Sequence, residues 1–140
     1  MSMQGLLLDT HVWLWYAEGI SGRLAGPALD AIEEARMDQR LFIATISVWE
    51  ISMLAAKGRI RLSAPLDTWI SQALSLPGLR QQTLDAQSAL ESTRLPGSPH
   101  GDPADRFVMA MARVHGLTLA TADAKIHEYA RAGYLDVMRV

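Results

Sequence analysis

The chain has 140 residues, of which 49% are hydrophobic and 20% are charged, and its formal net charge is −2. This composition is typical of a globular domain with a real core and excludes an intrinsically disordered chain. The absence of cysteine excludes disulfides, thiolate metal sites and thiol catalysis. The net charge is slightly negative, whereas proteins that bind nucleic acid non-specifically usually carry an excess of basic residues.

The amino-terminal segment has no pattern for export or membrane insertion. No Lys or Arg precedes Arg23, and Asp9 and His11 interrupt the first apolar run, so we do not expect a signal peptide. No stretch approaches the roughly 18 consecutive apolar residues of a membrane span. We therefore expect a cytoplasmic protein without membrane contact.

Strand-like and helix-like patterns alternate along the chain, with Gly and Pro at their boundaries. In chain order the patterns predict a strand at 5–8, helices at 11–17 and 27–36, a strand at 41–44, helices at 46–57 and 66–75, an edge strand at 79–83, helices at 85–93 and 103–115, a strand at 117–120, a helix at 123–132 and an edge strand at 137–140. There is no internal repeat or domain boundary, so residues 1–140 are expected to form a single domain. Such alternation predicts an α/β fold, a three-layer sandwich around a central, mostly parallel twisted sheet.

The first expected helix is dense in aromatic rings, among them Trp13 and Trp15. Rings at this density indicate core or partner-facing surface rather than a base-stacking platform. With Trp49 in the third helix, they lead us to predict a homodimer that also binds a short partner peptide.

Four acidic residues fall where parallel strands would end. Asp9 directly follows the first strand, and Asp123 comes just after the strand at 117–120. Glu50 lies one turn into the helix after the second strand, and Asp105 lies in the first turn of another helix. Ligands bind at this edge of an open α/β sheet. Because carboxylates in one crevice repel each other without a cation, the set predicts a site for a hard divalent cation and, through it, a phosphate group.

Each acid taken singly also fits a structural role. Asp9 and Asp123 are each placed to cap a helix, although Thr10 is an equally good N-cap for the first one. Ser47 to Glu50 fits a capping box, with Ser47 as the N-cap. Asp102 fits an N-cap before Pro103, and Asp105 would favour the helix dipole. Only the combination of acids favours a chemical site over caps.

Several polar neighbours fit the same chemistry. Thr121 lies two residues before Asp123 and is placed to orient a carboxylate through its hydroxyl. Arg106 either neutralises acid or contacts phosphate, or it is an ordinary solvated charge. His11 and His100 have no partner at ligand spacing, so we do not expect either to be catalytic.

Four short motifs run in order through nearly the whole chain: Leu6-Leu7-Leu8-Asp9-Thr10-His11, Ser47-Val48-Trp49-Glu50, His100-Gly101-Asp102-Pro103-Ala104-Asp105-Arg106 and Leu119-Ala120-Thr121-Ala122-Asp123. With them the sequence resembles a PIN domain of the VapC type, the toxin ribonuclease of bacterial toxin–antitoxin pairs. The resemblance implies a PIN-like fold, endoribonuclease activity dependent on Mg²⁺ or Mn²⁺, homodimerisation, and inhibition by a small antitoxin protein.

On this resemblance the family's catalytic, metal-binding acids fall on Asp9, Glu50, Asp105 and Asp123. Asp9 and Asp105 are expected to be the principal ligands. Thr121 matches the family's hydroxyl position and Asp102 an additional acid of this subgroup, whose role as ligand, substrate contact or helix cap stays open. Ala104 stands where the family often has an aromatic, usually Phe. The number of metal ions, the RNA target and the antitoxin are not given by the sequence.

Two other readings remain. A phosphatase of the haloacid dehalogenase kind also starts from a strand-end Asp, but His11 stands where its second acid is needed and Lys125 follows Asp123 instead of preceding it. A non-catalytic PIN-like domain that only binds a partner is the second alternative. The presence of all four acids argues against it.

Overall fold

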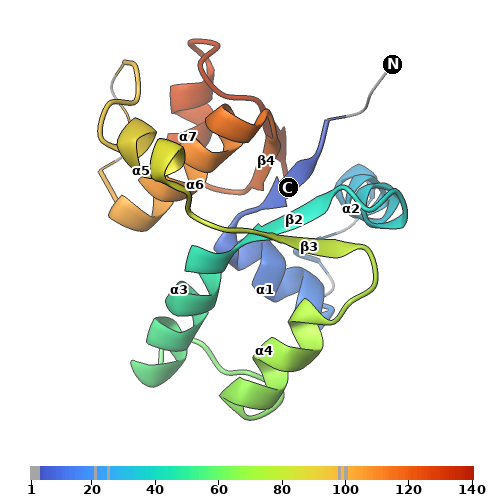
Figure 1. The fold of residues 1–140 in the computed structure, drawn as a ribbon. Helices are drawn as coiled ribbons and strands as arrows, with labels where there is room; N and C mark the ends of the chain where they lie inside the picture. Colours follow the sequence, from blue (N-terminus) through green and yellow to red (C-terminus); the bar gives the residue numbers. More distant parts are fainter. Residues whose placement is uncertain (1–3, 21, 25, 98, 100) are drawn as a thin grey trace.

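The computed structural model describes residues 4–20, 22–24, 26–97, 99 and 101–140 (Figure 1). In these residues five strands form one sheet, in the order β3-β2-β1-β4-β5. The strands are β1 (Leu6–Leu8), β2 (Leu41–Ala44), β3 (Leu79–Gln82), β4 (Thr118–Thr121) and β5 (Val137–Arg139). The helices are α1 (Thr10–Glu18), α2 (Pro27–Met37), α3 (Thr45–Ala56), α4 (Leu66–Leu74), α5 (Ala86–Ser92), α6 (Pro103–His115) and α7 (Ala124–Ala130).

All four strand pairings are parallel, and β1 is the central strand. Leu8 is in register with Ile43 of β2 on one side and with Ala120 of β4 on the other. The chain thus builds outward from β1 to β2 and β3, and later adds β4 and β5 on the opposite side. Such a switch in strand order opens a crevice at the carboxyl end of the central strand.

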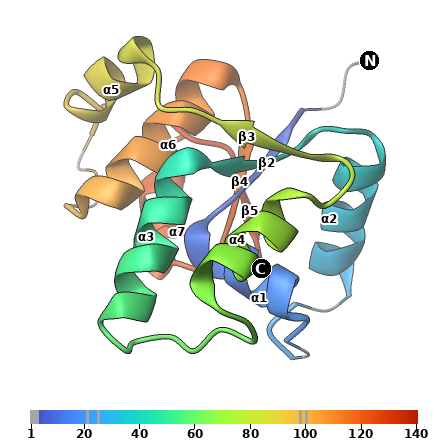
Figure 2. The same cartoon turned by 60° about the horizontal axis from the view of Figure 1, so that its bottom comes forward.

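Alternate residues of the central strands enter two separate hydrophobic clusters, one on each face of the sheet. Leu6 and Leu8 pack with buried residues of α1, α2, α3 and α4, whereas Leu7 packs with α6 and α7. Figure 2 shows α1, α2 and α4 on one side of the sheet and α5, α6 and α7 on the other. The predicted three-layer α/β fold is therefore confirmed, and the two-residue period of a strand buried on both faces explains why β1 is continuously apolar.

The elements agree with the sequence-based ranges to within one or two residues, but two predicted caps are wrong. The N-cap of α1 is Asp9, whose side chain accepts the Thr10 backbone N–H, so Thr10 is the first helical residue and not the cap. Helix α3 begins at Thr45 after Ala44, with no side-chain cap, so Ser47 lies inside the helix and the capping box with Glu50 does not form. Within the described residues, no helix is long and apolar enough to cross a membrane.

Candidate active site

Asp9 lies at the carboxyl end of β1, and its carboxylate is held from two elements. Its backbone N–H donates to Ala120 O at 3.0 Å, which continues the β1–β4 pairing by one residue. Asp9 Oδ1 accepts the Thr10 N–H at 2.9 Å, and Oδ2 accepts the Thr121 hydroxyl at 2.7 Å. Thr121 is fully buried, so this hydroxyl fixes the carboxylate from the neighbouring strand.

Glu50 reaches the same crevice from α3 through Thr10. The Thr10 hydroxyl donates to Glu50 Oε1 at 2.5 Å and lies 2.8 Å from Ser47 Oγ. Thr10 and Ser47 are both buried. The spacing of Ser47 and Glu50, three residues apart, places them on one helix face toward α1. The sequence did not identify Thr10 and Ser47 as positioning residues. It predicts Thr10 as an N-cap of the first helix, and Ser47 as the N-cap of a capping box with Glu50.

Asp102 and Asp105 stand at the start of α6, which crosses the opposite face of the sheet. Asp102 Oδ1 accepts the backbone N–H of Ala104 at 2.9 Å and of Asp105 at 3.4 Å, so Asp102 is the N-cap, as the sequence predicted. Asp105 lies in the first turn and is half-buried. The cap fixes the point at which α6 begins, and with it the position of Asp105.

Asp123 follows β4 and is tied to Asp9 through Thr121. Its backbone N–H donates to Thr121 Oγ1 at 3.0 Å, and its Oδ1 accepts the Lys125 N–H at 2.8 Å as the N-cap of α7. One threonine thus links the backbone before α7 to the carboxylate after β1. Asp123 caps a helix and also adds negative charge to the crevice.

The acids are close enough to change one another's ionisation. Burial, followed by the charges of Asp9, Asp102, Asp123 and Glu50, raises the pKa of Asp105 to about 8. Burial also raises the pKa of Asp9, against the lowering effect of the hydrogen bonds from Thr121 and Thr10. Burial, with the charges of Asp9 and Asp102, raises the pKa of Glu50, while the Thr10 hydrogen bond lowers it. Four elements therefore deliver mutually repelling carboxylates to one edge.

The donor set fits a hard divalent cation, because every candidate ligand is a carboxylate oxygen and the charges need neutralising. Among the described residues, however, no three carboxylate or imidazole groups already surround one point suited to a metal ion. Mg²⁺ usually keeps several waters and takes only one or two protein carboxylates. The arrangement therefore suits a hydrated ion better than a closed cage of protein ligands.

The other candidate residues lie at or beyond the margin of the crevice. Arg106 Nε donates to the Ser92 carbonyl at 3.0 Å, so Arg106 links α6 to the end of α5 and is not simply a solvated charge. His11 is exposed but lies near the acids, since its charge lowers the pKa of Asp9 and Glu50. His100 lies outside the described residues.

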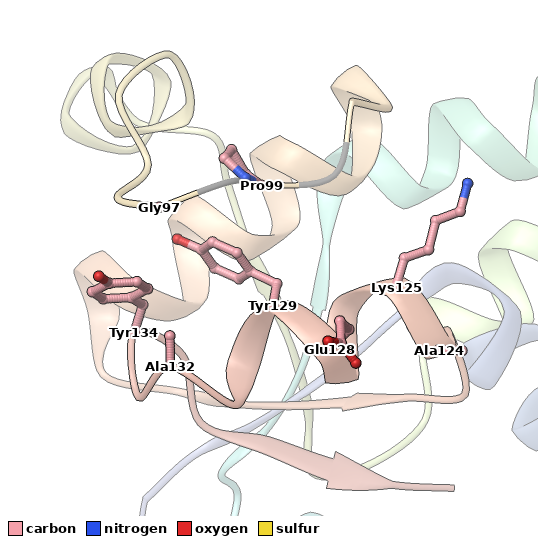
Figure 3. Close-up of a pocket in the computed structure, with 8 residues that line it drawn as sticks. All are labelled: Gly97, Pro99, Ala124, Lys125, Glu128, Tyr129, Ala132 and Tyr134. Carbon is pink, nitrogen blue, oxygen red and sulfur yellow. The ribbon is translucent and has the colours of Figure 1, made fainter.

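Two hollows border the site. A groove of about 370 Å³ between α3 and α6 is lined by Glu50 and Asp102 together with Ile46, Trp49, Met53, Pro103, Ala104 and Phe107. Ala104, where the family often has Phe, thus forms part of its wall. A wider pocket of about 660 Å³ lies along α7, and Figure 3 shows Tyr129 and Tyr134 side by side there, with Lys125 apart from them. The α7 pocket includes none of the four acids among its lining residues.

Comparisons with known proteins show the family of the chain. The family model described as PIN domain matches residues 6–132. The chain is 35% identical to "Ribonuclease VapC22" of Mycobacterium tuberculosis over 127 residues, which covers 91% of this chain and 93% of that protein.

Several solved structures have a similar fold, among them one described as a toxin–antitoxin complex from Klebsiella pneumoniae, with a TM-score of 0.63 at 20% identity, covering 96% of each chain. VapBC2 from Rickettsia felis, bound to a DNA fragment from its promoter, gives a TM-score of 0.71 at 15% identity, covering 96% of this chain and 97% of that one. FitAcB from Neisseria gonorrhoeae gives 0.65 at 20% identity, covering 95% and 96%. The likeness extends over nearly the whole chain. The matching family model is the PIN domain, and not that of the phosphatases of the haloacid dehalogenase kind. The chain belongs to the PIN domain family.

Proposed function

We propose that this protein is an endoribonuclease that depends on Mg²⁺ or Mn²⁺ and forms the toxin half of a toxin–antitoxin pair. The observation that carries the proposal is the convergence of Asp9, Glu50, Asp105 and Asp123 from four elements. Burial, together with the charges of the neighbouring acids, raises the pKa of Asp105 to about 8. The 35% identity with a ribonuclease of the same family supports RNA as the substrate. Its place of action would be the cytoplasm, where RNA is abundant.

Asp9 and Asp105 would be the principal ligands of the cation, and Glu50 and Asp123 further ligands, in part through water. A cation held by these residues would supply an activated water and would neutralise charge on the scissile phosphate. Thr121 and the Thr10 N–H keep both oxygens of Asp9 oriented. The Thr10 hydroxyl holds Glu50 toward the same crevice. Asp102 sets the start of α6 and with it the position of Asp105.

The proposed partners are a small antitoxin protein and a second copy of the chain. One structure with a similar fold is described as a toxin–antitoxin complex, which supports the first partner. Half-buried Trp15 is compatible with an interface. Trp13 does not support an interface, because it is 1% exposed and packs edge-on against Trp69 in the core.

The test is incubation of purified protein with a mixed RNA pool in Mn²⁺ or in excess EDTA, followed by mapping of the cleaved ends. We expect cleavage in Mn²⁺ and none in EDTA. Asp9→Asn, purified in parallel, should be inactive and would expose any contaminating nuclease. Asp67→Asn removes an exposed first-turn acid of α4, away from the crevice, and should remain active. Undiminished cleavage in EDTA by the wild type, with an inactive Asp9→Asn preparation, would contradict metal dependence.

A further inference from the structure

Trp49 is unusual among the tryptophans of this chain because much of its ring faces solvent. Its exposed fraction is 53%, compared with 1% for Trp13 and 4% for Trp69, which form an edge-to-face pair in the core. It precedes Glu50 on α3. A large exposed ring beside an active-site acid suggests contact with something outside the chain.

The surroundings of Trp49 form an apolar groove that opens onto the acids. Ile46, Trp49 and Met53 line it from α3, and Pro103, Ala104 and Phe107 line it from α6, two helices that lie against each other. Glu50 and Asp102 line the same groove. Its volume, about 370 Å³, lies within the range of small-ligand sites, roughly 300–1,000 Å³. A molecule held at the carboxylates would therefore continue directly into the groove.

We propose that this groove holds an unpaired base of the RNA substrate next to the scissile phosphate, stacked on the ring of Trp49. The inference rests on the proposed function and adds to it a residue that contacts the substrate beside the acids. The charge of the lining selects the base and not the backbone: Glu50 and Asp102 repel phosphate, whereas a neutral base fits between apolar walls. A base can reach such a groove only when it is unstacked from its neighbours.

The rings of the α7 pocket carry no comparable argument, because their own chain accounts for them. The Tyr129 hydroxyl donates to Pro96 O at 2.6 Å, and its ring packs against that of Tyr134 with 5.9 Å between centroids. A Cβ added at Gly97 would lie 2.9 Å from the Tyr134 ring, so the loop fits closely on this pair (Figure 3). These rings therefore contact the chain at Pro96 and Gly97.

The test compares Trp49→Ala and Trp49→Phe with Met37→Ala, which truncates a 76%-exposed side chain at the end of α2. Stacking on an aromatic ring is worth about 1–3 kcal/mol per base, which corresponds to about 5- to 150-fold. We expect Trp49→Ala to raise KM for single-stranded RNA by such a factor, with a smaller change in kcat. Trp49→Phe should recover most of this loss, and Met37→Ala should match the wild type. Ala104→Phe, which adds a ring to the wall of the groove, should raise KM as Trp49→Ala does.

Binding is measured separately by tryptophan fluorescence in Asp105→Asn protein with Mg²⁺, so that the RNA stays intact. Single-stranded RNA should quench the emission, duplex RNA of the same sequence should not, and Trp49→Phe in the same background should lose the quenching. An unchanged KM in Trp49→Ala, or equal quenching with and without Trp49, overturns the proposal. So does a dimer that Trp49→Ala converts to a monomer while RNA quenches nothing, because the groove is then an interface between copies. If the wild type cleaves no RNA but Trp49 is still quenched by it, the proposed function fails and the base-binding groove stands.

Discussion

The Thr121 hydroxyl donates to Asp9 Oδ2 at 2.7 Å and joins two residues that lie 112 positions apart in the sequence. The Thr121 hydroxyl oxygen also accepts the backbone N–H of Asp123 at 3.0 Å. A single buried side chain thus orients one acid of the candidate site and the backbone of another. The geometry of the acids therefore depends on neutral side chains that would not themselves contact a substrate.

Thr121→Val tests this dependence while keeping the shape of the side chain. The change removes the hydroxyl that donates to Asp9 Oδ2 and accepts the Asp123 N–H, so we expect the free energy of unfolding to fall by about 1–3 kcal/mol. Loss of the orienting contact should reduce cleavage by about 10- to 100-fold. Urea denaturation and RNA cleavage measure the two effects. Thr121→Ser retains the hydroxyl and should recover most of the activity, and equal losses in both variants would show that only packing matters.

Thr10→Val tests the link between α1 and Glu50. Without the hydroxyl, Glu50 loses its 2.5 Å hydrogen bond, and the Ser47 hydroxyl loses its hydrogen bond to Thr10. We expect the Mg²⁺ concentration for half-maximal cleavage to rise by about 10- to 100-fold. Metal titrations of activity measure the shift, with Thr10→Ser as the control that should bind metal almost as the wild type does. An unchanged titration would mean that Glu50 is positioned without Thr10.

Asp105→Asn separates a site residue from an ordinary helix-end acid. Removing one charge relieves repulsion in the metal-free protein, an effect that we place at about 1 kcal/mol after allowing for the partial exposure of Asp105. In EDTA at pH 8 the variant should melt roughly 2–8 °C above the wild type, yet cleave no RNA. Mg²⁺ should raise the melting temperature of the wild type more than that of the variant. Asp67→Asn is the matched control on α4, and it should leave both melting and cleavage unchanged. Melting equal to the wild type in EDTA, with retained cleavage, would make Asp105 an ordinary first-turn acid of α6.

The metal-free wild type should lose stability as pH rises. Because the pKa of Asp105 is raised from 3.8 to about 8, the folded state binds more protons than the unfolded state between these values. The slope of unfolding free energy against pH is therefore negative across this window. Melting temperatures in EDTA at pH 5, 7 and 9 should decrease in that order, and Asp105→Asn should flatten the trend. A wild type that grows more stable toward pH 9 would contradict the ionisation assigned to Asp105.

The fold and the gathering of the acids followed from sequence because both depend on local patterns. Leu6-Leu7-Leu8 is apolar at every position because β1 is buried on both faces, and Asp9 directly follows it. Once parallel strands were expected, acids just after strands or in first turns had to share one edge. The Asp102 cap was equally local, since Pro103 marks the first residue of α6.

Other features depended on packing that the sequence does not display. Ser47 and Glu50 have the spacing of a capping box, but α3 begins two residues before Ser47, so the same spacing instead directs both toward Thr10. Trp13 and Trp49 are the same residue type in helical segments, yet one is core and the other is exposed. Arg106 contacts the Ser92 carbonyl only because α5 folds against α6. Long-range contacts of this kind leave no periodic signal.

The central place of β1 also sets the order in which a ribosome can complete the site. Asp9 is synthesised before the other three acids, but β1 keeps one edge unpaired until Thr118–Thr121 has been made. A nascent chain stalled before that point has neither Thr121 nor Asp123 and presents an open strand edge that can pair with another chain. We therefore expect a chain stalled at that stage to lack the complete set of acids and to cleave no RNA.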